Sequence, residues 1–269
     1  MDYGGFNIME IGCSTVLFRN YTLRQAFDAI RSIGFEYIET QAVGSWCPHI
    51  NIEKDDPVKF AEMVKSYGFK KVTGLWMPNG AFISDEKSVE SGICAIEWAV
   101  AAGIPVVNMG DGFKPSGMSD EDALKILGER LNSVLEAAEK HGVYLAMEPH
   151  GTFSLTSTGL DKILSLTNSP MLGINYDTAN IHNAGEDEVF TLSQIADRVV
   201  HFHAKDLDKD KNCVALGTGE VKLDACINIL KKSNYKGVVS LESEGEEKFD
   251  EIVELAKASY IYLNNLIFQ

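Results

Sequence analysis

Paired cysteines and long apolar runs are both missing from this sequence. The cysteines are odd in number, five in all, and no two of them form a C-x-x-C pair. We therefore expect reduced thiols in a cytoplasmic protein. No apolar run reaches the roughly 18–20 residues of a membrane-spanning helix. The N-terminal stretch "MDYGGFNIMEIG" also lacks the basic and apolar regions of a secretory signal, so we expect neither a signal peptide nor a membrane partner.

Positive charge is scarce as well. The chain has 24 Lys and Arg against 39 Asp and Glu, a formal net charge of −15. A strongly acidic surface repels phosphate backbones and anionic lipids, so nucleic acid is not an expected partner. No Ser/Pro/Gly-rich linker or low-complexity tract divides the 269 residues, of which 45% are hydrophobic. We predict one domain over residues 1–269.

Short apolar runs alternate with amphipathic segments along the whole chain. The runs predict strands at residues 8–13, 37–41, 71–76, 106–109, 143–147, 172–176, 199–203 and 238–241. The helical patterns between them begin at capping residues such as Thr22 and Ser119 and end at glycines such as Gly34 and Gly142. Strands that alternate with helices are typical of parallel sheets.

Two parallel architectures fit this alternation, an open doubly wound sheet and a closed barrel. Eight strand–helix units in about 250 residues match the count and size of the barrel. The open sheet usually carries a glycine-rich fingerprint after its first strand, and "CSTVLFRNYT" follows here instead. We therefore predict an α/β fold, a single (β/α)8 TIM barrel.

Metal-capable side chains end four consecutive predicted strands. They are Glu148 in "LAMEPH", Asp177 in "GINYDTAN", His203 in "VVHFHAKD" and Glu242 in "VVSLESEG". Barrel active sites lie at the C-terminal ends of the strands, and neighbouring strands are about 4.8 Å apart, so these side chains can share one cation. One acid at a strand end is more often a helix cap or an ion-pair partner, but four in succession predict a metal site. Three carboxylates and one imidazole favour Mn²⁺ or Mg²⁺ over a closed tetrahedral zinc site.

Strand parity supports this interpretation. Side chains two residues apart on a strand point to the same face, so Ala146, Asn175, His201 and Ser240 should lie one layer deeper than the four ligands. Three of these residues are small or carry short polar groups. Such a layer suits the interior of a barrel beneath a polar site better than an outer face packed on helices.

The sequence resembles the xylose-isomerase-like barrel superfamily, the sugar phosphate isomerase/epimerase group, over nearly its whole length. The most specific parts are "MEPHG", "INYDTAN", "HFHAKD", "LGTGEV" and "VSLESEG". The resemblance implies that Glu148, Asp177, His203 and Glu242 bind one divalent ion, Mn²⁺, Mg²⁺ or Co²⁺, with Mn²⁺ expected here. In the ketose 3-epimerases of the group both Glu residues also move the proton. The group includes isomerases, epimerases, dehydratases and C-glycoside-cleaving enzymes, so the resemblance implies a sugar or keto-sugar substrate without naming it.

Two departures from the ketose 3-epimerases point to a second function. Those enzymes usually carry His where Asn180 stands here, and they do not usually carry the Glu-Pro-His that places His150 beside Glu148. In the similar C-glycoside deglycosidases, a His near a metal-binding Glu serves as the base, and the barrel pairs with a smaller β-rich subunit. We predict a metal-dependent sugar isomerase or epimerase, with Glu148 and Glu242 as catalytic residues. The alternative is a lyase that acts on a 3-keto-sugar with His150 as base, and a homo-oligomer or a smaller partner subunit fits either.

Several residues near the predicted strand ends are candidates for substrate contacts. They are His182, Lys205, Trp46, His49 and Trp76. Each has a structural alternative: a loop histidine, a surface lysine or a packing tryptophan. Glu39 is a further candidate for a hydrogen bond to substrate. The "LGTGEV" stretch lies where barrels often bind phosphate, although a tight turn is the alternative and the acidic balance favours an unphosphorylated sugar.

Two other functional classes share parts of this pattern. An endonuclease IV-like DNA repair enzyme would need more metal-binding histidines and a basic groove, and the chain has six histidines and an acidic balance. A barrel that only binds a partner would be expected to have lost a metal ligand. All four predicted ligands are present, which favours an enzyme.

Overall fold

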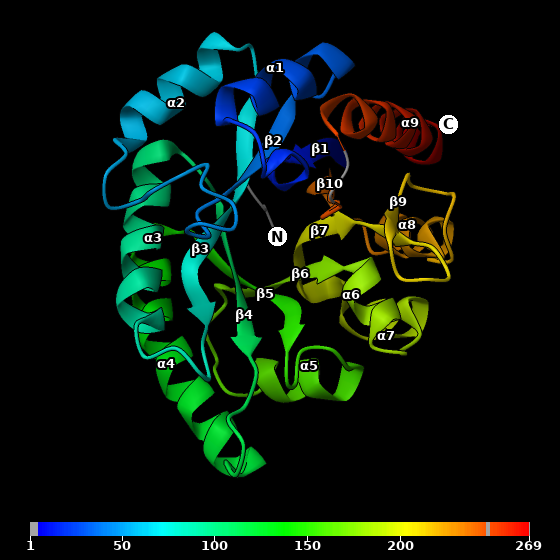
Figure 1. Cartoon of the computed structure of the whole chain (residues 1–269). Coiled ribbons are helices and arrows are strands. Elements are labelled where there is room, and N and C mark those ends of the chain that lie inside the picture. Colours follow the sequence, from blue (N-terminus) through cyan, green and yellow to red (C-terminus); the bar gives the residue numbers. More distant parts are fainter. Residues whose placement is uncertain (1–4, 246–247, 269) are drawn as a thin grey trace.

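The protein is described by a computed structural model over residues 5–245 and 248–268. Parallel strands close into a barrel in the order β1-β10-β7-β6-β5-β4-β3-β2 (Figure 1). The barrel strands are β1 (Glu10–Ser14), β2 (Tyr37–Gln41), β3 (Lys71–Ala81), β4 (Val106–Gly112), β5 (Tyr144–Gly151), β6 (Leu172–Asp177), β7 (Val199–Ala204) and β10 (Val238–Leu241). The first and last strands close the barrel, with Glu10 opposite Val238. The predicted (β/α)8 barrel is confirmed.

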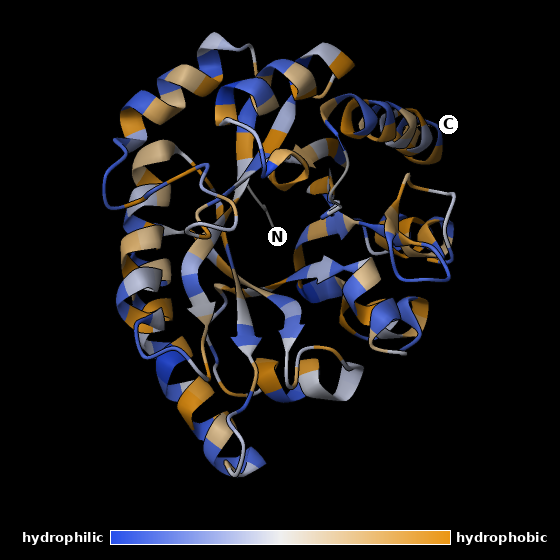
Figure 2. Cartoon of the chain, in the orientation of Figure 1, coloured by the Kyte–Doolittle hydropathy of each residue, from blue (hydrophilic) through white to orange (hydrophobic). Residues whose placement is uncertain are grey.

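An outer ring of helices surrounds the strands (Figure 1). The helices are α1 (Leu23–Ile33), α2 (Pro57–Ser66), α3 (Ser88–Ala102), α4 (Asp120–His141), α5 (Ser157–Leu164), α6 (Thr178–Asn183), α7 (Glu188–Ile195), α8 (Leu223–Lys232) and α9 (Phe249–Phe268), with 3-10 turns η1 (Thr15–Phe18) and η2 (Ala196–Arg198). Many of these helices carry both hydrophobic and hydrophilic residues, as expected for a ring with one face on the sheet (Figure 2). Within the described ranges, no helix is both long and apolar enough to cross a membrane.

Local sequence sets the helix boundaries. Thr22 and Gln25 form a reciprocal capping box at the start of α1, and Gly34 ends that helix at φ 118°. A positive φ is accessible to glycine at little cost, so the residue stops the helix and turns the chain into β2. The predicted boundaries of α1 and α4 therefore agree with the structure.

Several strand boundaries differ from prediction. The first strand begins at Glu10 rather than residue 8, and Ile8 is 57% exposed. Strands β3, β4 and β5 run past their predicted ends because Ala81 still pairs with Gly110 and Gly112 with Gly151. The Glu-Pro-His stretch is therefore part of β5, and its side chains are held by the sheet. The antiparallel pair β8 (Asp206–Leu207) and β9 (Cys213–Val214) was not predicted.

The inside of the barrel is partly polar. Hydrogen bonds link Glu39 of β2 to Asn108 of β4, His203 of β7 and Ser240 of β10. None of these strands neighbours β2 in the barrel. Only side chains that point inward can bridge such strands, so this polar network lies across the barrel interior and beneath the C-terminal strand ends.

Candidate metal centre

The four predicted ligands converge at the C-terminal end of the barrel. Their ligand atoms lie within 4.8 Å of one another, and all four residues are buried. Glu148 lies in β5, Asp177 ends β6, His203 lies in β7 and Glu242 directly follows β10. The Nδ1 atom of His203 is 3.2 Å from Glu242, 3.6 Å from Glu148 and 3.8 Å from Asp177.

The donor atoms fit a divalent cation. Asp177 Oδ1 accepts a hydrogen bond from the backbone N–H of Asn180 at 2.7 Å and so caps α6. Its Oδ2 is buried and has no hydrogen-bond partner among the described residues. Lys205 Nζ and His203 Nδ1 lie 3.7 and 3.8 Å from this oxygen, too far for a hydrogen bond, and a bound divalent cation would satisfy it at closer range. Burial also raises the pKa of Glu242 to about 8, with the Glu148 carboxylate adding to the rise.

Lys205 joins the cluster as a buried cation. Its Nζ lies 2.6 Å from Glu244, 3.4 Å from Glu242 and 3.7 Å from Asp177. Only 4% of Lys205 is exposed, so the alternative of a surface lysine is wrong. Sequence reasoning missed Glu244, whose one signal was its place two residues after Glu242, on the same side of an extended chain.

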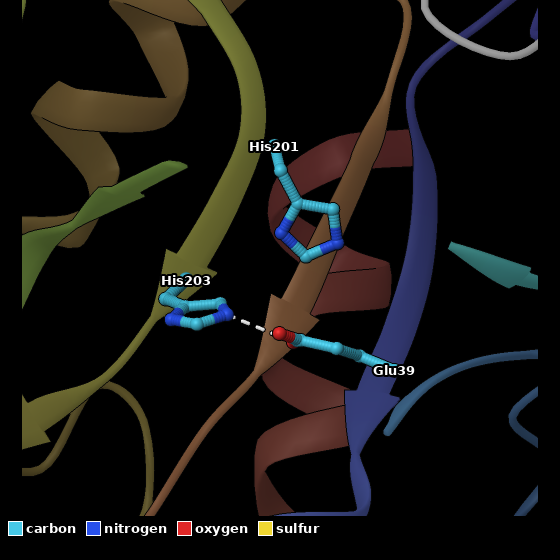
Figure 3. A group of neighbouring side chains, drawn as sticks. All are labelled: Glu39, His201 and His203. Carbon is cyan, nitrogen blue, oxygen red and sulfur yellow. Dashed lines mark hydrogen bonds and ion pairs between the residues drawn. The ribbon is translucent and has the colours of Figure 1, made fainter. Parts of the chain in front are cut away.

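A second polar layer lies directly beneath the cluster, as strand parity predicted. Asn175 Nδ2 donates to Glu148 Oε2 at 3.1 Å, and its Oδ1 lies 3.0 Å from His201 Nδ1. The other ring nitrogen of His201 is 3.1 Å from Thr73 Oγ1. Glu39 reaches His203 from β2, two intervening strands away in the barrel (Figure 3).

Glu39, His201 and His203 also bring ligand-capable atoms within 4.8 Å of one another. Both ring nitrogens of His201 already have hydrogen-bond partners, Asn175 and Thr73. Both carboxylate oxygens of Glu39 do as well. This group is therefore satisfied as a hydrogen-bond network and does not need an ion.

The buried His201 makes stability depend on pH. Burial lowers its pKa to about 4, whereas an unfolded histidine titrates near 6.5. Between these values the unfolded chain binds a proton that the folded protein does not, so stability is full above about pH 6.5 and falls as pH drops toward 4. The loss at pH 4 is about 3 kcal/mol.

We expect the free energy of unfolding in urea to fall less steeply between pH 7 and pH 4 in His201→Gln than in the wild type. Carboxylates titrate in the same range, so the difference between the two proteins isolates the histidine. Parallel stability curves for the two proteins would contradict the assignment.

A pocket of about 180 Å³ opens beside the cluster. Its lining residues are Gln41, Val43, Trp46, Trp76, Glu148, His150, Glu242 and Glu244. The imidazole of His150 is exposed and meets Trp76 edge-on, with ring centroids 6.3 Å apart. The structure therefore places Trp46, Trp76 and His150 around one space, together with two of the candidate ligands.

His49 and His182 are not among the residues that line this pocket. His49 is buried, with Nε2 3.1 Å from the carbonyl oxygen of Tyr21 and Nδ1 3.5 Å from Cys47 Sγ. His182 Nδ1 lies 3.3 Å from Glu188, which links α6 to α7. Both side chains contact neighbouring loops and helices because a position after a strand does not fix the direction of a side chain.

Glu39, a candidate for a hydrogen bond to substrate, also lies outside the pocket. Gln41 lines the pocket instead. Glu39 is fully buried under His203, whereas Gln41, two residues later on the same face of β2, lines the pocket. The Nε2 of Gln41 donates to Ser14 Oγ at 3.1 Å, and its Oε1 is buried without a partner among the described residues. Asn180 was not predicted as a site residue and stood out only because ketose 3-epimerases usually carry His at this position. Its Nδ2 lies 3.4 Å from Glu148 Oε1, so it contacts a candidate ligand.

The "LGTGEV" loop is closed by the Asp206 carboxylate. Its Oδ2 accepts from the N–H groups of Gly217 and Gly219, both at 2.9 Å, and its Oδ1 accepts from that of Val221 at 3.1 Å. A phosphate at this loop would need the same N–H groups. The arrangement agrees with the tight turn and not with the phosphate-binding alternative.

The end of β5 is fixed by Asp111. Ser154 Oγ donates to Asp111 Oδ1 at 2.6 Å and accepts from the backbone N–H of His150 at 2.9 Å. A Cβ at Gly151 would lie 2.1 Å from Asp111 Oδ1, so a side chain there would displace this carboxylate. The backbone that carries Glu148 and His150 is thus held in place by Ser154 at His150 and by Asp111 at Gly151.

A family model described as "Xylose isomerase-like TIM barrel" matches residues 27–264. The inosose dehydratase of Mesomycoplasma hyopneumoniae strain J is 30% identical over 177 residues, which covers 58% of each chain. The inosose dehydratase of Clostridium beijerinckii is 28% identical over 163 residues, 54% of this chain and 55% of that one. The chain thus spans somewhat more than half the length of the curated relatives it matches.

Solved structures of the same shape carry several functional names. A D-tagatose 3-epimerase-like protein superposes with a TM-score of 0.79 at 21% identity, covering 96% of this chain and 98% of that one. The probable 3-DHS dehydratase AsbF of Bacillus anthracis gives 0.76 at 20% identity, covering 96% and 99%. An IOLI protein with a binding zinc atom gives 0.79 at 18% identity, covering 96% and 98%. At these identities the likeness shows the fold alone.

Proposed function

The chain belongs to the xylose isomerase-like TIM barrel family, and from this membership we propose that it is a divalent-metal-dependent sugar isomerase or epimerase. The observation that carries the proposal is the convergence of Glu148, Asp177, His203 and Glu242 beside an aromatic-walled pocket. The Oδ2 of Asp177, buried without a hydrogen bond from any described residue, supports a cation there. Mn²⁺ suits the donor set best, with Mg²⁺ and Co²⁺ as alternatives.

The proposed reaction moves a proton next to a carbonyl. An ion held by the four residues would supply Lewis acidity worth several kcal/mol. Glu148 and Glu242 both lie at the cluster and line the pocket, so their carboxylates are the candidate bases for proton transfer. A positioned carboxylate base contributes roughly 10²–10⁴-fold to the rate. Removal of the proton gives an enediolate. Return of the proton to the other face of the same carbon gives an epimer, and its return to the neighbouring carbon gives an isomer.

The pocket fits a small, neutral polyol. Trp46 and Trp76 offer apolar faces to the C–H groups of a sugar, and Gln41 Oε1 is a hydrogen-bond acceptor without a partner among the described residues. We propose that this oxygen accepts a hydrogen bond from a substrate hydroxyl. Lys205 does not line this pocket, but its Nζ, buried among Asp177, Glu242 and Glu244, would limit negative charge in the site.

A second candidate function is elimination from a keto-sugar with His150 as base. His150 is exposed in the pocket beside two candidate ligands, and it is not needed to complete the set of four. Sequence relatives named inosose dehydratase favour loss of a β-substituent. In this reaction His150 Nδ1 or Nε2 takes the proton next to the carbonyl, and the group on the following carbon leaves. A C-glycoside deglycosidase-type lyase acting on a 3-keto-sugar would use the same step, with a smaller partner subunit.

Hydrogen exchange with solvent tests the proposed function. We expect the Mn²⁺-loaded protein in D₂O to place deuterium at one carbon of a free ketopentose or ketohexose, as seen by NMR. His150 is not a base in the proposed reaction, so His150→Ala should keep its metal and retain this rate within about tenfold. Loss of a true general base would instead lower the rate roughly 10²–10⁴-fold. EDTA-treated protein is the control.

The opposite pattern would favour the lyase. That pattern is no exchange in any ketose, turnover of a 3-keto-glycoside by the wild type, and loss of this turnover in a His150→Ala variant that still holds its metal.

A further inference from the structure

Glu39 is a fully buried carboxylate that substrate cannot reach. It accepts hydrogen bonds from Asn108 Nδ2 at 2.8 Å and Ser240 Oγ at 3.1 Å. Its Oε2 is also 2.8 Å from His203 Nε2 (Figure 3). An ionised carboxylate offers only acceptors, and each oxygen of Glu39 already accepts a hydrogen bond from a neighbouring donor, one from Asn108 and the other from Ser240. Nε2 of His203 must therefore carry the hydrogen of this bond.

The two ring nitrogens of His203 face different surroundings. Nε2 points across the barrel to Glu39, and Nδ1 points to Glu148, Asp177 and Glu242. A neutral imidazole has one N–H and one lone pair, so a hydrogen on Nε2 leaves the lone pair on Nδ1. We propose that Glu39 is a positioning residue that fixes His203 in the tautomer whose Nδ1 binds the metal. This inference rests on the metal site of the proposed function.

Two other side chains in contact with the His203 ring, Asn175 and His201, do not fix its tautomer. Asn175 Nδ2 lies 3.2 Å from Nε2 and 3.5 Å from Nδ1 of His203, but it is a donor and is bonded to Glu148 at 3.1 Å. A donor cannot hold a hydrogen on the ring. The His201 ring stands edge-on to the His203 ring, with centroids 5.4 Å apart at 89°, and resists its rotation. When an ion is held by the carboxylates that face Nδ1, Glu39 is the acceptor that remains to hold the hydrogen, on Nε2.

The position of Glu39 adds to its effect. A carboxylate behind a metal-bound histidine raises the basicity of the ligand and orients its ring, and loss of such a partner typically costs 10–100-fold in metal affinity. Glu39 is anchored at three points and shielded from water, so its orientation costs little entropy on binding. A residue of β2 thereby controls a ligand on β7, on a strand that is not its neighbour in the barrel.

The test uses Zn²⁺, which is diamagnetic and suits NMR, with wild-type protein, Glu39→Gln and Thr73→Val. Thr73 bonds His201 and not His203, so its variant disturbs the same layer without touching the proposed link. Zn²⁺ affinity is measured by competition with a chelator. The His203 ring is observed by ¹⁵N NMR of Zn²⁺-loaded, histidine-labelled protein.

We expect the wild type to show Zn²⁺ on Nδ1 and a downfield N–H signal at Nε2. Glu39→Gln keeps the shape of the side chain but loses its charge, so the affinity should fall about 10–100-fold and the N–H signal should move upfield. Thr73→Val should stay within about twofold of the wild-type affinity and keep the signal.

Each of three results would overturn the inference while leaving the metal site intact. The first is wild-type Zn²⁺ on Nε2, which decides the matter even if Glu39→Gln does not fold. The second is an unchanged affinity in Glu39→Gln. The third is an equal loss in Thr73→Val, which would mean general loosening of the layer. A wild type that binds no Zn²⁺ would overturn the metal proposal and this inference together.

Discussion

Asp177→Ala is expected to lose its metal almost completely. Asp177 supplies one of three carboxylates to the cluster, and its Oδ2 has no other hydrogen-bond partner among the described residues. Removing a direct ligand should lower the affinity by more than the roughly 10–100-fold that supporting residues cost. Elemental analysis after dialysis should find far less than one equivalent of Mn²⁺, and turnover should fall in proportion.

Asp177→Asn separates this effect from a helix cap. Asp177 Oδ1 also caps α6 through the N–H of Asn180, and removal of such a cap costs about 1 kcal/mol. Asparagine keeps an acceptor for the cap but weakens the charge that holds the ion. Metal-free Asp177→Asn should therefore melt close to the metal-free wild type, while Asp177→Ala melts lower. An Asp177→Ala variant that holds a full equivalent of metal would remove Asp177 from the site.

Mn²⁺ is expected to raise the melting temperature of chelator-treated protein by about 5–10 °C. At a free concentration 100 times the dissociation constant, a ligand that binds only the folded state adds about 2.7 kcal/mol. For a domain of this size each kcal/mol is worth about 2–4 °C. The ion also relieves the repulsion between buried carboxylates that converge on one point. Activity should disappear with EDTA and return with Mn²⁺.

The same melting experiment on Asp177→Ala is the matched control. This variant should show little or no shift at the same Mn²⁺ concentration, since one ligand is missing. Identical melting curves for wild-type protein with and without saturating Mn²⁺ would contradict a preformed site. An equal rise in both proteins would point to ions bound elsewhere on the acidic surface.

The barrel and the cluster could be predicted because both follow from regular features of the chain. Parallel strands deliver their last residues to one edge of the sheet, so Glu148, Asp177, His203 and Glu242 had to lie close together once the fold was assumed. Strand parity placed Asn175 and His201 beneath them for the same reason. These predictions needed only periodicity and the order of the strands.

The depth of a side chain in the barrel, and the direction of a side chain in a loop, could not be predicted in the same way. Glu39 and Gln41 share one face of β2, and only the stagger of the strands decides that Glu39 lies under His203 while Gln41 lines the pocket. His49 and His182 sit in irregular segments whose partners, a Tyr21 carbonyl and Glu188, depend on tertiary packing. The apolar run that predicts β5 ends at Met147, whereas backbone pairing with β4 carries the strand on to Gly151.

The candidate metal ligands and one wall of the pocket come from different halves of the chain. The four candidate ligands follow from β5 onward, whereas Gln41, Val43, Trp46 and Trp76 of the pocket wall come from the β2 and β3 region. With Glu39 kept in place, this wall can be randomised without altering a ligand. If the proposed function holds, a library confined to those four wall positions would vary which substrates are admitted while every member keeps the same four candidate ligands, a favourable starting point for directed evolution.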